Sequence, residues 1–160
     1  MSGMLRLGLA VAAVILVADQ ATKHYFYDLL VIGGVRYIEV LPFFNLVTVW
    51  NYGVSFGMMT NDSQLGPWLF VALALAITVA LVVWLRRATT RMVALALGMV
   101  IGGAIGNVVD RLRYGAVFDF LDFHAFGWHW PAFNLADSGI SIGVILLLAD
   151  GLLGDRRSTK

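Results

Sequence analysis

Cysteine is absent from this 160-residue chain, and proline and charged residues are scarce. Without cysteine the chain forms no disulfides, has no thiolate nucleophile and offers no cysteine metal ligands, although this absence does not identify a compartment. Charged residues make up 13% of the chain, and a net charge of +1 provides no large basic surface, so nucleic acid is not an expected partner. No Ser/Pro-rich linker or charge block divides the sequence. We therefore expect a single domain over residues 1–160.

What the chain has in abundance is apolar sequence. Hydrophobic residues account for 60% of it and the mean hydropathy is +0.83, which is typical of an integral membrane protein. The apolar run 7–18 alone has the length of a signal-peptide core. Because Asp19-Gln20 follows it in place of a small-residue cleavage site, we expect it to be retained and to continue through Lys23. The predicted transmembrane helices are about 5–26, 68–85, 92–109 and 138–153.

The basic residues predict how these helices are oriented. Lysine and arginine concentrate on the cytoplasmic side of membrane proteins. Seven basic residues fall on the side that holds both predicted termini and the 86–91 loop, and the remaining four fall on the other side. We therefore expect both termini in the cytoplasm and the segments of about 28–66 and 110–137 outside.

Two segments each place an aspartate three residues after an asparagine: 106–111 with Asp110, and 133–138 with Asp137. The expected topology brings both acids, with Asp19, to one membrane face, where two carboxylates could share a proton and activate water. We interpret Asp110 as the proton carrier at a helix C-terminus and Asp137 as the ionised base at a helix N-terminus. The alternative for Asp110 is a purely structural salt bridge to Arg111 or Arg113.

Small residues also point to Asp110. Gly98, Gly102 and Gly106 recur every four residues, and Asp110 is the next position on that helix stripe. Such a stripe allows close approach of another helix, and 139–143 offers a matching glycine surface on the last helix. We expect Asp110 to face the bundle or a cleft.

The outward segment 37–57 is rich in β-branched and aromatic residues. It predicts short strands at 37–40 and 46–50, which cannot cross a bilayer as an open sheet and so form a small cradle on its surface. Residues 51–57 read as a loop that could hydrogen-bond an extended peptide, or as a simple glycine turn. The aromatic run 123–130 suggests interfacial anchoring, or a flap that closes over substrate.

Other chemistries have weaker support. The three histidines lack zinc-motif spacing, and no metal or cofactor is expected. Ser138 is more simply a helix-start residue than a nucleophile, and nothing in the spacing of Lys23 and Ser55 supports a Ser/Lys dyad. A proton-coupled transporter stays open, although the acids cluster at one face. A membrane scaffold is the third possibility.

Five elements in order resemble the bacterial lipoprotein signal peptidases, the signal peptidase II family. They are Asp-Gln-Ala-Thr-Lys at 19–23, Asn-Tyr-Gly-Val-Ser-Phe at 51–56, Gly-Asn-Val-Val-Asp-Arg at 106–111, Val-Phe-Asp-Phe at 117–120 and Phe-Asn-Leu-Ala-Asp-Ser at 133–138. The resemblance covers nearly the whole chain. It implies four transmembrane helices with a periplasmic β-rich cradle, in the bacterial inner membrane.

The resemblance further implies an aspartic endopeptidase that cleaves prolipoproteins just before their diacylglyceryl-modified cysteine. Its partners would be these substrates, membrane lipids and inhibitors of the globomycin type. Asp110 and Asp137 match the catalytic pair as we align it. The positions that match substrate-binding or site-supporting residues are Asp19, Lys23, Asn51, Gly53, Asn107, Arg111 and Asn134.

Overall fold

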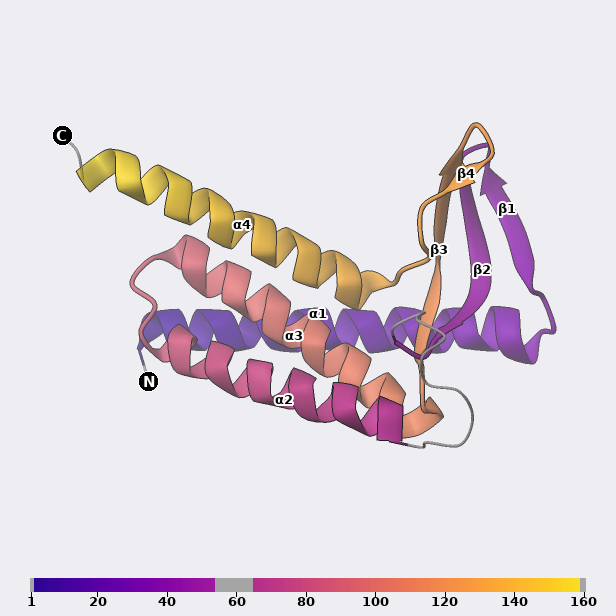
Figure 1. Ribbon diagram of the computed structural model, residues 1–160, viewed down its shortest axis with the longest axis horizontal. Coiled ribbons are helices and arrows are strands. Elements are labelled where there is room, and N and C mark those ends of the chain that lie inside the picture. Colours follow the sequence, from indigo (N-terminus) through magenta and orange to yellow (C-terminus); the bar gives the residue numbers. More distant parts are fainter. Residues whose placement is uncertain (1, 54–64, 159–160) are drawn as a thin grey trace.

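The computed structural model describes residues 2–53 and 65–158 of the chain. Its long helices are α1 (Gly3–Phe26), α2 (Leu65–Arg86), α3 (Arg91–Tyr114) and α4 (Leu135–Ser158). They run side by side, and a small sheet stands across one end of the bundle (Figure 1). Each helix includes a stretch long and apolar enough to cross a membrane. The predicted class, mainly helical with four transmembrane helices and a small β-rich element, is confirmed.

The helices extend further at the sheet end than their apolar runs suggest. A π-helix, η1 (Tyr27–Ile32), continues α1, and α3 runs five residues beyond its predicted end, to a left-handed Gly115 with φ of 75°. Asp110 therefore lies one turn inside α3. Its expected place at the C-terminal end of that helix is wrong, because the polar turn 111–114 stays helical. The helix α4 begins at Leu135, which puts Asp137 in its first turn.

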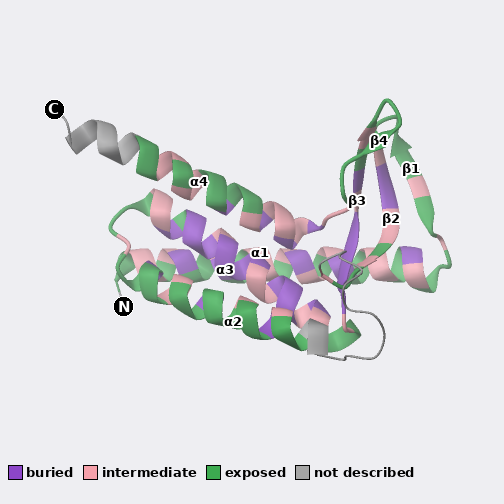
Figure 2. Ribbon diagram, viewed as in Figure 1, coloured by how far each residue is buried: buried purple, intermediate pink, exposed green. Residues whose placement is uncertain are grey.

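Helix α3 forms the centre of the bundle and is the most buried of the four, whereas α2 and α4 expose their outer faces (Figure 2). The glycine stripe of α3 packs on α1: a Cβ at Gly98 would collide with the Gly8 carbonyl, and one at Gly102 would lie 2.5 Å from the Ala12 carbonyl oxygen. Gly143 of α4 meets a different face of α3, at Ala96. The expected pairing of the stripe with the α4 glycines is thus corrected.

The sheet has the strand order β1 (Tyr37–Leu41), β2 (Phe44–Asn51), β3 (Val117–Ala125) and β4 (Trp128–His129), with antiparallel pairing throughout. The two strands expected at 37–40 and 46–50 are present. The strands β3 and β4 arise from a segment for which we predicted no strand. Of the loop 51–57, residues 54–57 lie outside the described residues.

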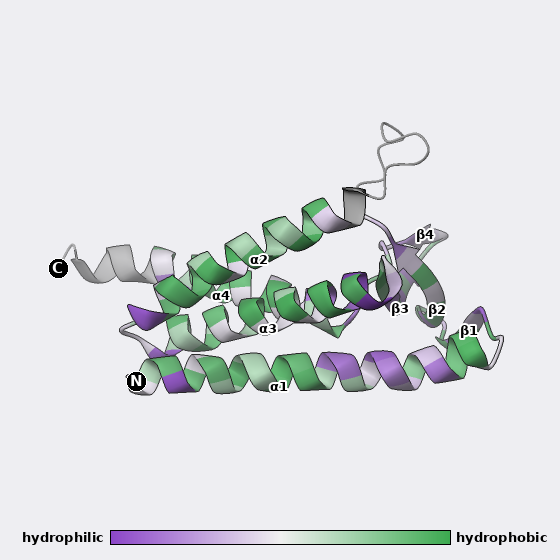
Figure 3. Ribbon diagram, turned by 90° about the horizontal axis from the view of Figure 1, so that it is seen from below, coloured by the Kyte–Doolittle hydropathy of each residue, from purple (hydrophilic) through white to green (hydrophobic). Residues whose placement is uncertain are grey.

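Strand β3 separates two environments. Phe118 and Phe120 are buried in an apolar cluster with Leu30 and Leu46. Because side chains alternate along a strand, Asp119 points to the opposite face. Figure 3 shows that hydrophilic residues gather on the half of α1 nearest the sheet. The polar site therefore lies where the helix ends meet β3.

Candidate active site

A buried lysine connects α1 to α3. Lys23 Nζ lies 3.0 Å from Asp19 Oδ2 and 2.9 Å from Asp110 Oδ2, and it donates to Asn107 Oδ1 at 3.0 Å. Lys23 is 5% exposed, and both acids are almost fully buried. A buried cation requires such partners, because desolvation is otherwise costly. The structure thus brings four of the sequence-predicted residues into one network.

Asp110 is surrounded by donors. Besides Lys23, it accepts hydrogen bonds from Gln20 Nε2 at 3.1 Å and from the Phe118 backbone N–H at 3.1 Å. Its ion-pair partner is a lysine and not Arg111 or Arg113, the two residues considered from sequence. Through these contacts Asp110 joins α1, α3 and the start of β3.

Asp137 and Asn134 cap α4 reciprocally. The Asn134 side-chain oxygen accepts the Asp137 backbone N–H at 3.0 Å, and Asp137 Oδ2 accepts the Asn134 backbone N–H at 3.2 Å. This is the geometry of a capping box with aspartate in place of glutamate. Asn107 Nδ2 donates to the other oxygen, Oδ1, at 2.8 Å. The Asp137 carboxylate is therefore held by donors at both oxygens.

The residue that sequence reasoning missed is Asp119. It is 1% exposed, and it accepts hydrogen bonds from Asn134 Nδ2 at 2.7 Å and from Asn51 Nδ2 at 3.1 Å. Burial, and then the nearby charge of Asp137, raise the pKa of Asp119 to about 7. The Val-x-Asp-Phe element that contains it was available as a signal, but we assigned it no role.

Asp19 anchors the start of α4 to α1. Its Oδ1 accepts the Ala136 backbone N–H at 2.9 Å, while Oδ2 pairs with Lys23 and accepts from Gln20. A side chain at Gly106 would press on this carboxylate, since its Cβ would lie 2.5 Å from Oδ2. Through these contacts Asp19 ties the first turn of α4 to α1 and to Lys23.

Arg111 and Gly53 meet at an aromatic ring. The Arg111 guanidinium lies over Phe70 of α2, 5.6 Å from the ring centroid, and Nη1 donates to the Asn107 carbonyl at 3.3 Å. Gly53 has φ of 101° and leaves no room for a Cβ beside the same ring. Its N–H donates to Asn51 Oδ1 at 3.0 Å, which orients the Asn51 amide toward Asp119.

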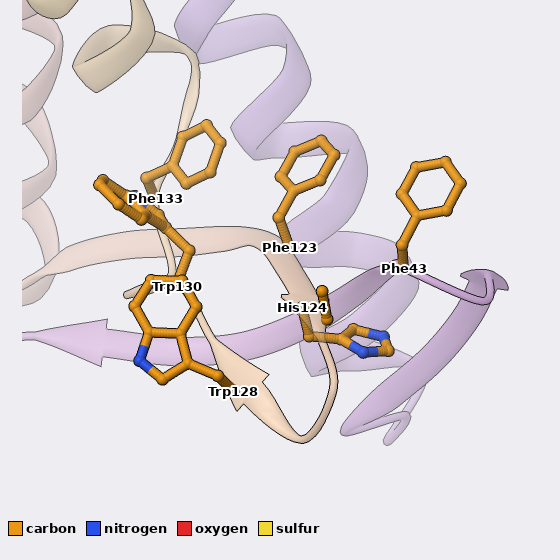
Figure 4. Close-up of a pocket in the computed structure, with 7 residues that line it drawn as sticks. Phe43, Phe123, His124, Trp128, Trp130 and Phe133 are labelled. Atoms are coloured by element: carbon orange, nitrogen blue, oxygen red, sulfur yellow. The ribbon is translucent and has the colours of Figure 1, made fainter.

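The aromatic run lines a pocket of about 410 Å³ on the sheet, together with Phe43 and Phe133. Phe43, Phe123 and Phe133 stand on the same side of β3 (Figure 4). Phe133 immediately precedes Asn134, and its backbone pairs with Leu121 of β3. The pocket thus adjoins the carboxylate site. Among residues 2–53 and 65–158, no group of three or more His, Asp or Glu side chains could hold a metal ion.

In the described residues, four apolar helices with buried carboxylates at one end form the architecture of a multi-pass membrane protein with a candidate carboxylate site. Residues 11–153 match the family Signal peptidase (SPase) II. The chain belongs to this family, which is a family of aspartic peptidases and places it in the bacterial inner membrane.

Named relatives and a solved structure are also similar to this chain over most of its length. The lipoprotein signal peptidase of Methylobacterium sp. (strain 4-46) is 47% identical over 151 residues, covering 94% of this chain and 92% of its own. That of Methylobacterium radiotolerans is 46% identical over 158 residues, covering 97% and 91%. A solved bacterial membrane enzyme, determined by the in meso method at 2.3 Å resolution, superposes with a TM-score of 0.76 at 30% identity, covering 96% of this chain and 91% of its own.

Proposed function

We propose that this enzyme removes the signal peptide of diacylglyceryl-modified prolipoproteins, and that Asp119 and Asp137 are its catalytic carboxylates. The observation that carries the assignment is the position of Asn134, whose side chain donates to Asp119 while its backbone donates to Asp137. The pair inferred from sequence, Asp110 with Asp137, gives way here to Asp119 with Asp137. The reason is that both oxygens of Asp110 are already occupied by contacts with Lys23, Gln20 and the Phe118 backbone N–H.

The two carboxylates have complementary environments. Asp119, with its pKa raised to about 7, is protonated in a large fraction of molecules near neutral pH. Asp137 lies in the first turn of α4, where its two oxygens accept hydrogen bonds from the Asn107 side chain and the Asn134 backbone. Two acids whose surroundings differ in this way can take the acid and base roles of a hydrolase. In this proposal, Asp137 is the base, as the sequence suggested, and Asp119 is the proton carrier.

The chemistry follows from those states. Asp137 removes a proton from a water molecule while the oxygen of that water attacks the scissile carbonyl carbon. Asp119 protonates the carbonyl oxygen in the same step. As the tetrahedral intermediate collapses, the C–N bond breaks. Asp137 then gives its proton to the leaving amine of the lipid-bearing cysteine, and Asp119 recovers its own from the intermediate hydroxyl. Both carboxyl groups thus regain their starting protonation states, while the proton taken from water ends on the leaving amine, so the dyad is ready for another cycle.

The remaining predicted residues support this site. Asp19 and Lys23 join the helices that carry it, Asn51 with Gly53 orients Asp119, and Asn107 binds Asp137. Arg111 lies beside the carboxylates, and among residues 2–53 and 65–158 its Nε has no hydrogen-bond partner. We assign that donor to a peptide carbonyl of the substrate.

The membrane geometry supports the same reaction. In the positive-inside orientation, the start of α1, the 86–91 loop and the end of α4 are cytoplasmic, and the sheet lies on the periplasmic side. The carboxylates then lie at the outer ends of the spans, at the depth of lipid headgroups. A signal helix with a lipidated cysteine at its outer end presents its scissile bond at that depth. Membrane lipids and globomycin-type inhibitors are the further partners that we propose.

The test is cleavage of a purified diacylglyceryl-modified prolipoprotein by the reconstituted full chain. We compare the wild type with Asp119→Asn, Asp137→Asn and Asp110→Asn, and we check that each is folded. We expect no detectable cleavage by the first two and residual cleavage by folded Asp110→Asn. Complete loss in Asp110→Asn with activity in Asp119→Asn would restore the pair inferred from sequence. A folded wild type that does not cleave would refute the peptidase assignment.

A further inference from the structure

The side-chain amide of Asn107 lies between the buried lysine and the proposed base. Its Oδ1 accepts from Lys23 Nζ at 3.0 Å and from Asn134 Nδ2 at 3.3 Å, and its Nδ2 donates to Asp137 Oδ1 at 2.8 Å. The two ends of an amide differ chemically, since one accepts and the other donates. Which end faces Asp137 therefore decides whether that carboxylate gains a hydrogen bond or a repulsive contact.

The surroundings permit only one orientation of this amide. A flip about its last torsion would turn the NH₂ group toward the Lys23 ammonium and the Asn134 NH₂ group. It would also turn the carbonyl oxygen toward the Asp137 carboxylate. All three contacts would become donor against donor or acceptor against acceptor, at a site where buried polar groups cannot turn to water instead. The donors Lys23 and Asn134 therefore fix the Asn107 carbonyl oxygen on their side, and this directs the Asn107 NH₂ group toward Asp137.

Lys23 is itself fixed in place. An ammonium group has three hydrogens to donate, and Lys23 meets three acceptors: Asp19 Oδ2, Asp110 Oδ2 and Asn107 Oδ1. With the residue 5% exposed, water is largely excluded from these contacts. The two acids neutralise the lysine and restrain its side chain, so its remaining hydrogen points at Asn107.

We propose that Lys23 is a positioning residue for catalysis that acts on Asp137 through Asn107. The Asp19–Lys23–Asp110 group sets the orientation of the Asn107 amide, and that amide holds the Asp137 carboxylate toward the water that attacks. This role rests on the proposed function of Asp137 as the base. It goes beyond a structural ion pair, because it predicts that Lys23 affects the reaction only while Asn107 is present.

A double-mutant cycle on the reconstituted full chain tests this dependence. The variants are Lys23→Met, Asn107→Ala and both together, each checked for folding, with kcat and KM measured on the lipidated prolipoprotein. We expect each single variant to lose about 100-fold in kcat, the scale of a misplaced catalytic group, with KM changed less than about threefold. We expect the double variant to fall within about threefold of Asn107→Ala.

Two further variants separate positioning from folding. Gln20→Met is the matched control, because Gln20 donates to Asp19, Asp110 and the Gly106 carbonyl but forms no hydrogen bond with Asn107. We expect its effect on kcat to multiply with that of Asn107→Ala. Lys23→Gln retains an N–H donor without the charge, and we expect it to recover at least about tenfold of the kcat lost in Lys23→Met. This variant also serves if Lys23→Met does not fold.

Several outcomes would overturn the proposal. Multiplicative losses for Lys23→Met and Asn107→Ala would show that Lys23 acts independently of the amide. A Lys23 effect confined to KM or to folding yield would do the same, and either result would leave the peptidase mechanism intact. If folded Asp137→Asn cleaves as fast as wild type in the same assay, both the proposed base and this inference fail.

Discussion

Asp110 and Asp119 are nine positions apart in sequence and equally buried, yet their partners differ in kind. Asp110 faces a buried ammonium, whereas Asp119 faces two neutral amides and the charge of Asp137. A buried carboxylate beside a cation stays ionised, and one beside another acid tends to keep its proton. The partners, and not the depth of burial, distinguish an ion pair from a group that can exchange protons near neutral pH.

The rate of cleavage should fall as pH rises above about 7. Asp119, with its pKa at about 7, loses above that pH the proton that we assign to the scissile carbonyl. We expect kcat to decline about tenfold for each unit of pH well above 7. Initial rates between pH 5 and pH 9 measure this. A rate that stays level to pH 9 would rule out Asp119 as the acid.

The same proton links pH to stability. The pKa of Asp119 is raised from 3.8 to about 7 on folding, so the folded state binds a proton that the unfolded chain releases above about pH 4. The contribution of this proton to the free energy of unfolding is complete below about pH 4 and is lost as pH rises through about 7. It amounts to up to about 4 kcal/mol. Asp119→Asn should flatten the decline in unfolding temperature between pH 4 and pH 8. Parallel curves for the two proteins would contradict this.

Sequence reasoning recovered most of the site but not Asp119. Asp19 with Lys23, Asn107 and Asn134 with Asp137 all stand on helices or at their ends, where hydropathy and helical spacing indicate which residues meet. Asp119 reaches the site only because β3 alternates between an apolar face and a polar face. That strand pairs with β2, which lies about seventy residues earlier in the chain. Strand pairing between segments so far apart in the chain is not visible in the local sequence pattern of either strand.

At the scale of elements, Asn134 belongs both to a helix cap and to the site. Asn134→Ser retains a capping oxygen but removes the amide that binds Asp119, whereas Asn134→Ala removes both. We expect Asn134→Ala to be less stable than Asn134→Ser by about 1 kcal/mol, the usual value of a cap. Both should lose cleavage to a similar extent. Thermal unfolding and initial rates, measured in parallel, distinguish the two roles. Equal stability of the two variants would argue against the cap.

The close approach of α1 and α3 is also open to test. Gly102→Val places a branched side chain against the Ala12 carbonyl and Ile15, so the helices must separate. We expect a loss of about 1–3 kcal/mol or more, as for overpacked cores. Gly151→Ala on α4 is the control, because a Cβ there meets nothing within 4 Å and alanine favours a helix. If both variants unfold at the wild-type temperature, the glycine contact is not a constraint.

Hydropathy located the four described spans but made the helices too short at the sheet side. The apolar run of α3 stops at Val109, where we ended the helix, whereas the helix continues until Gly115 takes a left-handed conformation. Arg111 and Arg113 belong to this last part. A helix that extends out of the hydrocarbon region keeps its backbone hydrogen bonds while its side chains become polar. The length of the apolar run therefore indicates where the membrane ends, whereas the glycine cap indicates where the helix ends.

At the scale of the whole molecule, the absence of cysteine makes its orientation directly measurable. Thr89→Cys, in the exposed α2–α3 loop, and Gly127→Cys, in the exposed β3–β4 turn, place single thiols at opposite ends of the bundle. In intact inner-membrane vesicles of known sidedness, we expect a membrane-impermeant maleimide to label Gly127→Cys only from the periplasmic side and Thr89→Cys only from the cytoplasmic side. The opposite pattern would reverse the topology and the location of the site.

The reciprocal bonds between Asn134 and Asp137 bear on how a substrate complex should be trapped. Asp137 contributes to the fold of α4 as well as to the proposed reaction, so replacing it changes the first turn of that helix along with the chemistry. Asp119 occupies a strand and ends no helix. An inactive enzyme meant to retain an uncut prolipoprotein for crystallography or cryo-electron microscopy is therefore better made with Asp119→Asn, which keeps the reciprocal bonds between Asn134 and Asp137 and an oxygen that can accept from the Asn134 side chain.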